Sequence, residues 1–112
     1  WLQTPNIDAL GHRRFGFHWL GLDPPRHLSL LTPKTLCNLI EDCGFTFKEF
    51  PLPALMALSV YQDSEAMAKG SPQIGARLRW RSLLRIAWLS DAWRQSHSLA
   101  QAEFITLEAT KI

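Results

Sequence analysis

Cysteine, clustered charge and long apolar runs are all scarce in this chain of 112 residues, and each absence excludes a class of protein. The only cysteines, Cys37 and Cys43, fall on one side of a single predicted helix, so a disulfide framework is excluded. Basic residues number 12 and acidic residues 10, a balance too even to indicate a nucleic-acid-binding surface. Because the sequence has neither a run of about 18 apolar residues nor a signal-peptide pattern, we expect a reducing, cytoplasmic compartment.

The histidines, too, lack a pattern that would indicate a metal. A zinc site uses closely spaced pairs of histidine, cysteine or carboxylate ligands. The four histidines are not arranged in this way, and we predict no metal ligand among them: His12, His18, His27 and His97.

The composition that remains is that of a folded domain. Hydrophobic residues make up 46% of the chain and charged residues 20%, which is typical of a globular protein with an apolar core. The first residue is Trp1 rather than methionine, and residues 1–6 resemble the end of a strand running into a turn at Pro5 and Asn6. We therefore expect a piece of a longer protein, with the preceding strands of its sheet upstream.

Local signals predict a helix, a strand, a second helix and a final strand. Thr32 is a good N-cap, Pro33 suits the first helical position, and Gly44 suits the turn after the helix. Between them, one apolar stripe is predicted to be buried: Leu36, Leu39, Ile40 and Cys43. The expected elements are a short helix and ordered loop over 8–30, a helix over 33–43, a strand over 45–52, a helix over 72–95 beginning at Ser71-Pro72, and a strand over 103–111; residues 55–70 are ambiguous.

The predicted helix over 72–95 combines arginine with tryptophan, notably at Trp80, Trp88 and Trp93. Such a helix can lie on an anionic membrane surface or grip a partner protein. Its apolar positions are nevertheless spread around most of the circumference. The simpler interpretation is a helix packed on a sheet, with arginine side chains extending past apolar neighbours to solvent.

An ordered series of short motifs resembles the C-terminal half of a class I S-adenosylmethionine-dependent methyltransferase. In that family a Pro-Asn turn follows the fifth strand, a W-x-G-L-D-x-P-R-H-L segment follows a short helix, and a Gly-Phe pair leads into the sixth strand. The corresponding residues here are Pro5-Asn6, Trp19–Leu28, Thr32-Pro33 and Gly44-Phe45, while Glu103–Lys111 resembles the closing strand. The match covers residues 2–53 and 102–111 well and the intervening segment loosely.

The resemblance implies an α/β fold, the C-terminal part of a Rossmann-like class I methyltransferase sheet: the end of the fifth strand, a helix, the sixth and seventh strands, and an extra long helix. The chain would be a single partial domain, with a post-strand loop and short helix over 1–31, a helix and strand over 32–53, a helical insertion over 54–100 and the final strand over 101–112. This half supplies the acceptor side of the cleft and the antiparallel pair that completes the sheet.

The resemblance also implies S-adenosylmethionine as cofactor, although its main binding motif is absent from this chain. Gly11, Gly16 and Gly21 stand five apart and do not form the Gly-rich loop that a nucleoside cofactor requires. The expected partners are a small-molecule or lipid-like methyl acceptor and the missing N-terminal half, on the same or a separate chain. We expect this chain alone to be inactive.

Candidate site residues lie in the motif-bearing segments. His27 is the candidate catalytic base, because its ordinary pKa suits proton transfer near neutrality and Pro24-Pro25 would stiffen its loop. Asp23 and Arg26 are candidate substrate contacts that equally suit a loop-bracing ion pair, and hydrogen bonding of the loop to the sheet remains an alternative for all three. Asn6, His12 and Trp19 are further candidate substrate contacts, with a turn role open for Asn6 and a core role for Trp19.

The leading prediction is therefore the acceptor-side half of a methyltransferase. The alternative is an interaction module without enzymatic activity, whose Arg/Trp-rich segment over 72–95 docks on a partner protein or an anionic membrane surface.

Overall fold

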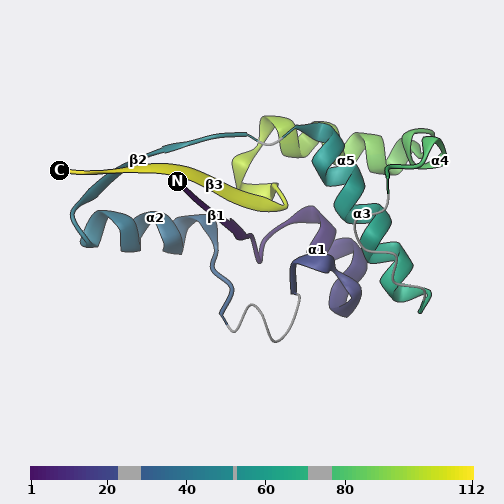
Figure 1. Cartoon of the computed structure of the whole chain (residues 1–112), viewed down its shortest axis with the longest axis horizontal. Helices are drawn as coiled ribbons and strands as arrows, with labels where there is room; N and C mark the ends of the chain where they lie inside the picture. Colours follow the sequence, from purple (N-terminus) through teal and green to yellow (C-terminus); the bar gives the residue numbers. More distant parts are fainter. Residues whose placement is uncertain (23–28, 52, 71–76) are drawn as a thin grey trace.

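A computed structural model of the chain describes residues 1–22, 29–51, 53–70 and 77–112. It is a mixed α/β structure, as predicted. The sheet with helix α2 forms one end of the molecule, and the other helices gather at the opposite end (Figure 1). The longer elements are β1 (Leu2–Pro5), α1 (Leu10–Phe15), α2 (Pro33–Asp42), β2 (Phe45–Glu49), α3 (Ala54–Ala68), α4 (Trp80–Leu83), α5 (Ile86–His97) and β3 (Phe104–Lys111).

The three strands lie in the order β1-β3-β2, with the last strand of the chain in the middle. β3 is antiparallel to both neighbours, with Pro5 opposite Phe104 and Glu49 opposite Leu107. β1 and β2 are therefore parallel to each other, and their carboxyl ends lie at the same edge of the sheet. The strands predicted over 45–52 and 103–111 are confirmed, although β2 ends at Glu49.

Helix α2 begins and ends where its capping signals predict. The Thr32 hydroxyl accepts a hydrogen bond from the Thr35 N–H at 3.1 Å, and Gly44 follows the helix with φ +82°. Leu36 is buried on this helix and packs with Ile105 and Leu107 of β3.

The predicted buried stripe of α2 is wrong at two positions. Leu39 is 47% exposed, and Cys43 is also exposed. α2 contacts the sheet through Leu36 and Ile40, because a single helix on a narrow sheet buries a narrow stripe of its surface. Leu39 and Cys43 lie outside that stripe. Cys37 rather than Cys43 is the partly buried thiol, at 3.6 Å from Glu49 Oε1.

The helical end contains more helix than the sequence predicts, and its helices begin and end at other residues than predicted. The ambiguous residues 55–70 form most of α3, and the single helix expected over 72–95 is wrong within the described residues. There, α4 ends at Leu83 and α5 starts at Ile86. The predicted start at Ser71-Pro72 lies outside the described residues.

The side chain of Gln62, on α3, explains why residues 77–79 are not helical. Its amide donates to the Arg77 carbonyl at 3.1 Å, and its oxygen accepts from the Arg79 N–H at 2.7 Å and the Ser82 hydroxyl at 3.1 Å. A continuous helix would need these backbone groups for its own ladder. α5 packs against α3, not on a sheet as the sequence predicts.

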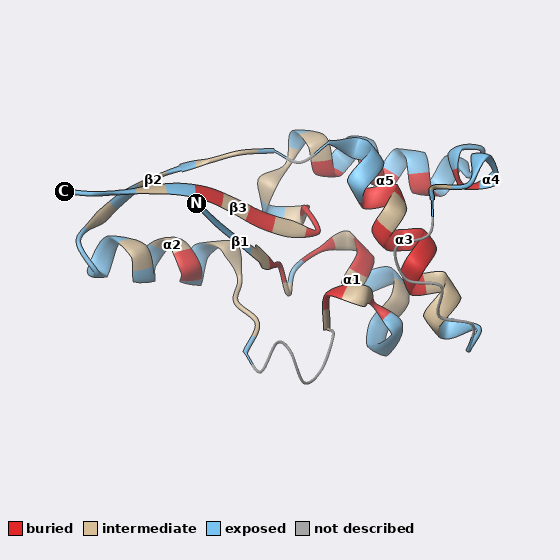
Figure 2. Ribbon diagram, viewed as in Figure 1, coloured by how far each residue is buried: buried red, intermediate tan, exposed pale blue. Residues whose placement is uncertain are grey.

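Burial is concentrated at this helical end, in α3, the inner side of α5 and the segment around α1 (Figure 2). Phe15, Tyr61 and Trp88 meet edge to face, with ring centroids 5.1 to 6.1 Å apart. Among the described residues, no helix is long and apolar enough to cross a membrane.

Candidate functional site

The polar centre of the helical end is Glu103, the residue that precedes β3. Its side chain is buried, with only 1% of the residue exposed. The carboxylate accepts hydrogen bonds from Trp19 Nε1 at 3.1 Å, from Gln95 Nε2 at 3.4 Å and from the backbone N–H of Gly11. Burial raises the pKa of Glu103 to about 8, because the charged form loses its hydration; the donors favour the charged form and limit the rise.

Gly11 is required by the position of this carboxylate. A Cβ atom at Gly11 would overlap the Glu103 carboxylate. The glycine lets the first turn of α1 bring its backbone N–H to the acid. The Glu103 carboxylate thus connects α1, near the N-terminus, to the start of β3.

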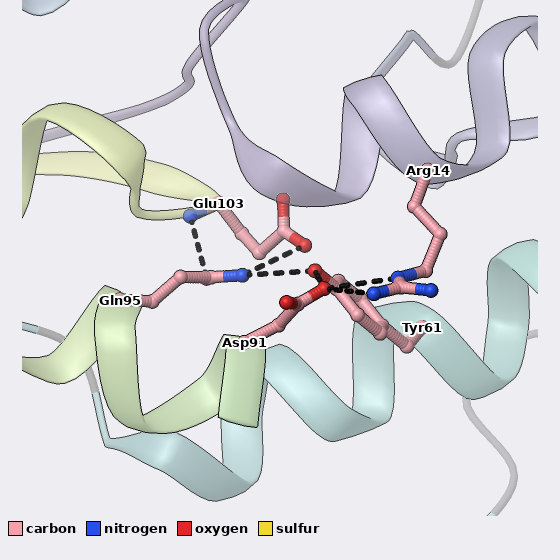
Figure 3. A network of polar contacts seen from close by, with 5 residues as sticks. All are labelled: Arg14, Tyr61, Asp91, Gln95 and Glu103. Carbon is pink, nitrogen blue, oxygen red and sulfur yellow. Dashed lines mark hydrogen bonds and ion pairs between the residues drawn. The ribbon is translucent and has the colours of Figure 1, made fainter. Parts of the chain in front are cut away.

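From Glu103 the polar contacts continue to the surface (Figure 3). Gln95 Nε2 also donates to the Tyr61 hydroxyl at 3.3 Å, and that hydroxyl donates to Asp91 Oδ2 at 2.8 Å. Arg14 closes the series, with Nη2 at 2.7 Å from the same Asp91 oxygen. The polar network of Glu103, Gln95, Tyr61, Asp91 and Arg14 therefore links α1, α3, α5 and the start of β3.

Electrostatics within the network favour a protonated Tyr61 and a charged Arg14. Burial, together with the hydrogen bond to Asp91, raises the pKa of Tyr61 far above its usual range. The hydrogen bond to Asp91 raises the pKa of Arg14, against a smaller opposing effect of burial. The phenol is therefore a permanent donor to Asp91.

Asn6 lies at the carboxyl end of β1 and is fully buried. Its Nδ2 donates to the carbonyls of Ala100 and Ala102 at 3.0 and 2.9 Å, and its Oδ1 accepts from the Asp8 N–H at 3.0 Å. The bond from Asp8 belongs to the turn that the sequence offers as the alternative for Asn6, and the other two join this turn to the segment before β3. Substrate binding by Asn6 stays a prediction.

His12 and Trp19 lie together beside this turn, with ring centroids 5.1 Å apart. Trp19 is fully buried and donates to Glu103, so it occupies the core position that the sequence leaves open. His12 is half-buried, and its Nδ1 lies 2.7 Å from the Ile7 carbonyl oxygen. Since a carbonyl only accepts, Nδ1 bears the proton in this bond, and Nε2 of the neutral ring is the nitrogen able to accept one.

The remaining predicted site residues, Asp23, Arg26 and His27, lie outside the described residues. In the parts of the chain that the structure describes, no three histidine, cysteine or acidic side chains are grouped closely enough to hold a metal ion. A shallow pocket lies at the opposite edge of the sheet from Asn6, lined by Glu41, Phe45, Thr46, Phe47 and Ile112.

Sequence reasoning missed the polar network. A signal for it exists on α5, where Asp91 and Gln95 fall on the same helical stripe as Trp88 and Ala92. Polar residues on an otherwise apolar, buried stripe require partners. Their partners lie on other elements, which the sequence of this helix does not specify.

No protein-family model, curated protein or solved structure matches the chain.

Proposed function

We propose that the chain forms the acceptor-binding side of a class I S-adenosylmethionine-dependent methyltransferase, acting on a small-molecule or lipid-like acceptor. The proposal includes the finer fold prediction, in which β1, β2 and β3 are the fifth, sixth and seventh strands of a Rossmann-like sheet. It rests on the motif resemblance together with one structural observation.

That observation is the position of α1 and of the segment that precedes it, at the carboxyl end of β1. β1 and β2 are parallel, and α1 together with the segment around Asn6 and His12 follows directly from the carboxyl end of β1. In open α/β sheets, ligands bind outside the carboxyl ends of the strands. β2 and β3 are antiparallel, as the last two strands of such a sheet would be, and this supports the proposal.

His12 is the described residue best suited to contact an acceptor. The Ile7 carbonyl fixes its tautomer, Trp19 supports its ring, and Nε2 is the proton-accepting atom. A hydroxyl or amine acceptor could donate a hydrogen bond to this nitrogen and be oriented by it. We retain His27 as the proposed catalytic base.

The described residues do not fit S-adenosylmethionine itself. The Glu103 carboxylate fills the space beside the Cα atom of Gly11, and Gly16 ends α1 with φ +55°. Neither belongs to a loop that could cradle a nucleoside. The cofactor would be bound by another half of the enzyme, upstream of Trp1 or on a separate chain.

A cofactor-binding titration tests the proposal. The native protein, with whatever its reading frame encodes upstream of Trp1, is titrated with S-adenosylhomocysteine in a calorimeter and compared with residues 1–112. We expect saturable binding by the native protein or by a complex with its partner chain, and none by residues 1–112. Absence of binding by the purified native assembly would overturn the proposal.

Acceptor binding is tested separately, with labelled methyl transfer to carbon, oxygen and nitrogen acceptors. His12→Ala should raise KM for the acceptor while leaving cofactor binding unchanged. His97→Ala is the matched control, because His97 is an exposed histidine at the end of α5. Equal KM values for the two variants would remove His12 from the acceptor site.

A further inference from the structure

Helices α4 and α5 expose large apolar side chains to solvent, most strongly at Ile86, which is 82% exposed. Trp80 and Leu84 are each 66% exposed, and Trp93 is 62% exposed. We call the exposed apolar residues of these two helices and their junction the outer face: Trp80, Leu83, Leu84, Ile86, Leu89 and Trp93. Scattered single exposures are ordinary in proteins, but a concentration of this kind marks an interaction surface.

On α5 the outer face lies opposite the side that packs into the molecule. The buried stripe, which contacts α3 and the polar network, consists of Trp88, Asp91, Ala92 and Gln95. Ile86, Leu89 and Trp93 recur at helical spacing on the other side. This explains why the apolar residues are spread around the helix: one set forms the core, and the second set has no contact that buries it within the described chain.

The charge around the outer face is strongly positive. Residues 77–97 contain five of the twelve basic residues of the chain and one of its ten acidic residues. All five arginines are exposed: Arg77, Arg79, Arg81, Arg85 and Arg94. The one acid, Asp91, is buried and paired with Arg14, while Arg85 pairs with Glu65 on α3.

We propose that the outer face binds peripherally to the surface of a lipid bilayer that contains anionic lipids. Tryptophan prefers the membrane–water interface, and an interfacial helix combines apolar residues on one face with arginine or lysine beside it. The arginine side chains can reach lipid phosphates while the apolar side chains enter the boundary of the acyl chains. Exposed tryptophan, leucine and isoleucine favour lipid over nucleic acid, whose phosphates alone would need only the arginines.

This inference does not depend on the methyltransferase proposal, because it uses none of the residues of the candidate site. It would place a lipid-like acceptor near the enzyme if both proposals hold. The chain can therefore bind vesicles without binding a cofactor, and the two proposals can fail separately.

Vesicle co-sedimentation of the whole chain is the direct test. Vesicles of phosphatidylcholine alone are compared with vesicles containing phosphatidylglycerol, at low and at physiological salt. We expect binding that increases at least tenfold with the anionic lipid and weakens as salt screens the arginines. No binding to anionic vesicles overturns the proposal, as does equal, salt-insensitive binding to both compositions.

Two sets of variants separate the apolar and charged contributions. Ile86→Ser with Trp93→Ser should reduce vesicle binding at least tenfold, and Arg79→Gln with Arg81→Gln and Arg94→Gln should remove most of the salt dependence. Phe17→Ser with Ile112→Ser is the matched control: these residues are 94% and 85% exposed and lie outside the outer face.

Because all the substituted residues are exposed, far-UV circular dichroism and urea denaturation should show an intact fold in every variant. If the Ile86/Trp93 variant binds vesicles as the control does, the outer face is not the contact. A third outcome is that the unsubstituted chain does not bind vesicles but associates with itself, and that the Ile86/Trp93 variant loses this self-association. The outer face would then be a protein interface, and the proposal would be wrong.

Discussion

The two ends of the molecule are stabilised by different kinds of interaction. The sheet end, where α2 lies on β3, closes on an apolar cluster around Leu36, Ile105 and Leu107. The helical end also has an aromatic cluster, but its elements are joined by the polar network that runs from Glu103 to Arg14. Neighbouring parts of one chain therefore offer different tolerances to substitution.

The difference follows from the directionality of the contacts. Apolar packing depends on volume and tolerates repacking, whereas a buried donor or acceptor that loses its partner costs about 1–3 kcal/mol. We therefore expect the helical end to respond to single atoms and to pH, and the sheet end to respond mainly to side-chain size.

The largest effect is expected for Tyr61→Ala. The change removes a buried ring from the aromatic cluster and leaves Asp91 and Gln95 without their common partner. Loss of about 3–5 kcal/mol in the free energy of unfolding is expected, measured by urea denaturation. Phe47→Ala on β2 is the control at the sheet end and should cost less, because Phe47 is only half-buried. Equal costs would erase the contrast between the two ends.

A smaller loss is expected for Gly11→Ala, about 1–3 kcal/mol, because the new methyl group overlaps the Glu103 carboxylate. A double-mutant cycle with Glu103→Ala locates the clash. If the carboxylate is the obstacle, adding Gly11→Ala to Glu103→Ala has little further effect on stability. Full additivity of the two changes would place the obstacle elsewhere.

Per pH unit, a smaller effect is expected from the titration of Glu103, which should distinguish the helical end from the sheet end. The pKa of Glu103 is raised from its ordinary value of 4.5, expected in the unfolded chain, to about 8 in the folded chain. The folded state therefore binds this proton more tightly than the unfolded state does. Its contribution to stability is fully present below pH 4.5 and is lost as the pH rises towards 8, by at most about 1.4 kcal/mol per pH unit.

Glu103→Gln should flatten this slope, as measured by urea denaturation across the same pH range. Glu108→Gln on β3 is the matched control, since Glu108 is exposed and should leave the slope unchanged. A slope that survives Glu103→Gln would assign the titration to another group.

The smallest effect is expected where the network reaches solvent. Arg14→Met removes one partner of Asp91, and Tyr61 remains; the change should cost about 0.5–1 kcal/mol, because the Arg14 side chain is 37% exposed and solvent weakens the pair. Lys69→Met removes a more exposed pair with Glu65 and should change thermal stability very little. A larger cost for Lys69→Met than for Arg14→Met would contradict the importance of the network.

The sequence predicts well those features that depend on neighbouring residues. Thr32 and Gly44 bound α2 correctly, and the alternation of residues 45–49 predicts β2, because capping and strand periodicity are local. The site residues are predicted less completely: Asn6 and Trp19 are central to the structure, but their partners are buried backbone and Glu103 rather than groups that face a ligand.

The missed features depend on contacts between distant residues. Glu103 and Trp19 are brought together by the whole fold, and neither residue type alone indicates the other. In the same way, residues 77–79 stay out of a helix because Gln62 on α3 holds the backbone at Arg77 and Arg79, whereas helix propensity alone favours continuity there.

Gln62 also has a consequence for the surface of the molecule. It is buried on α3, yet it sets the path of the chain that leads to Trp80 and Leu83. If residues 77–79 were helical instead, Trp80 and Leu83 would follow them around one helix axis at the helical repeat. The shape of an exposed surface thus depends on an interior residue. A substitution at the buried Gln62 can change which side chains the protein exposes.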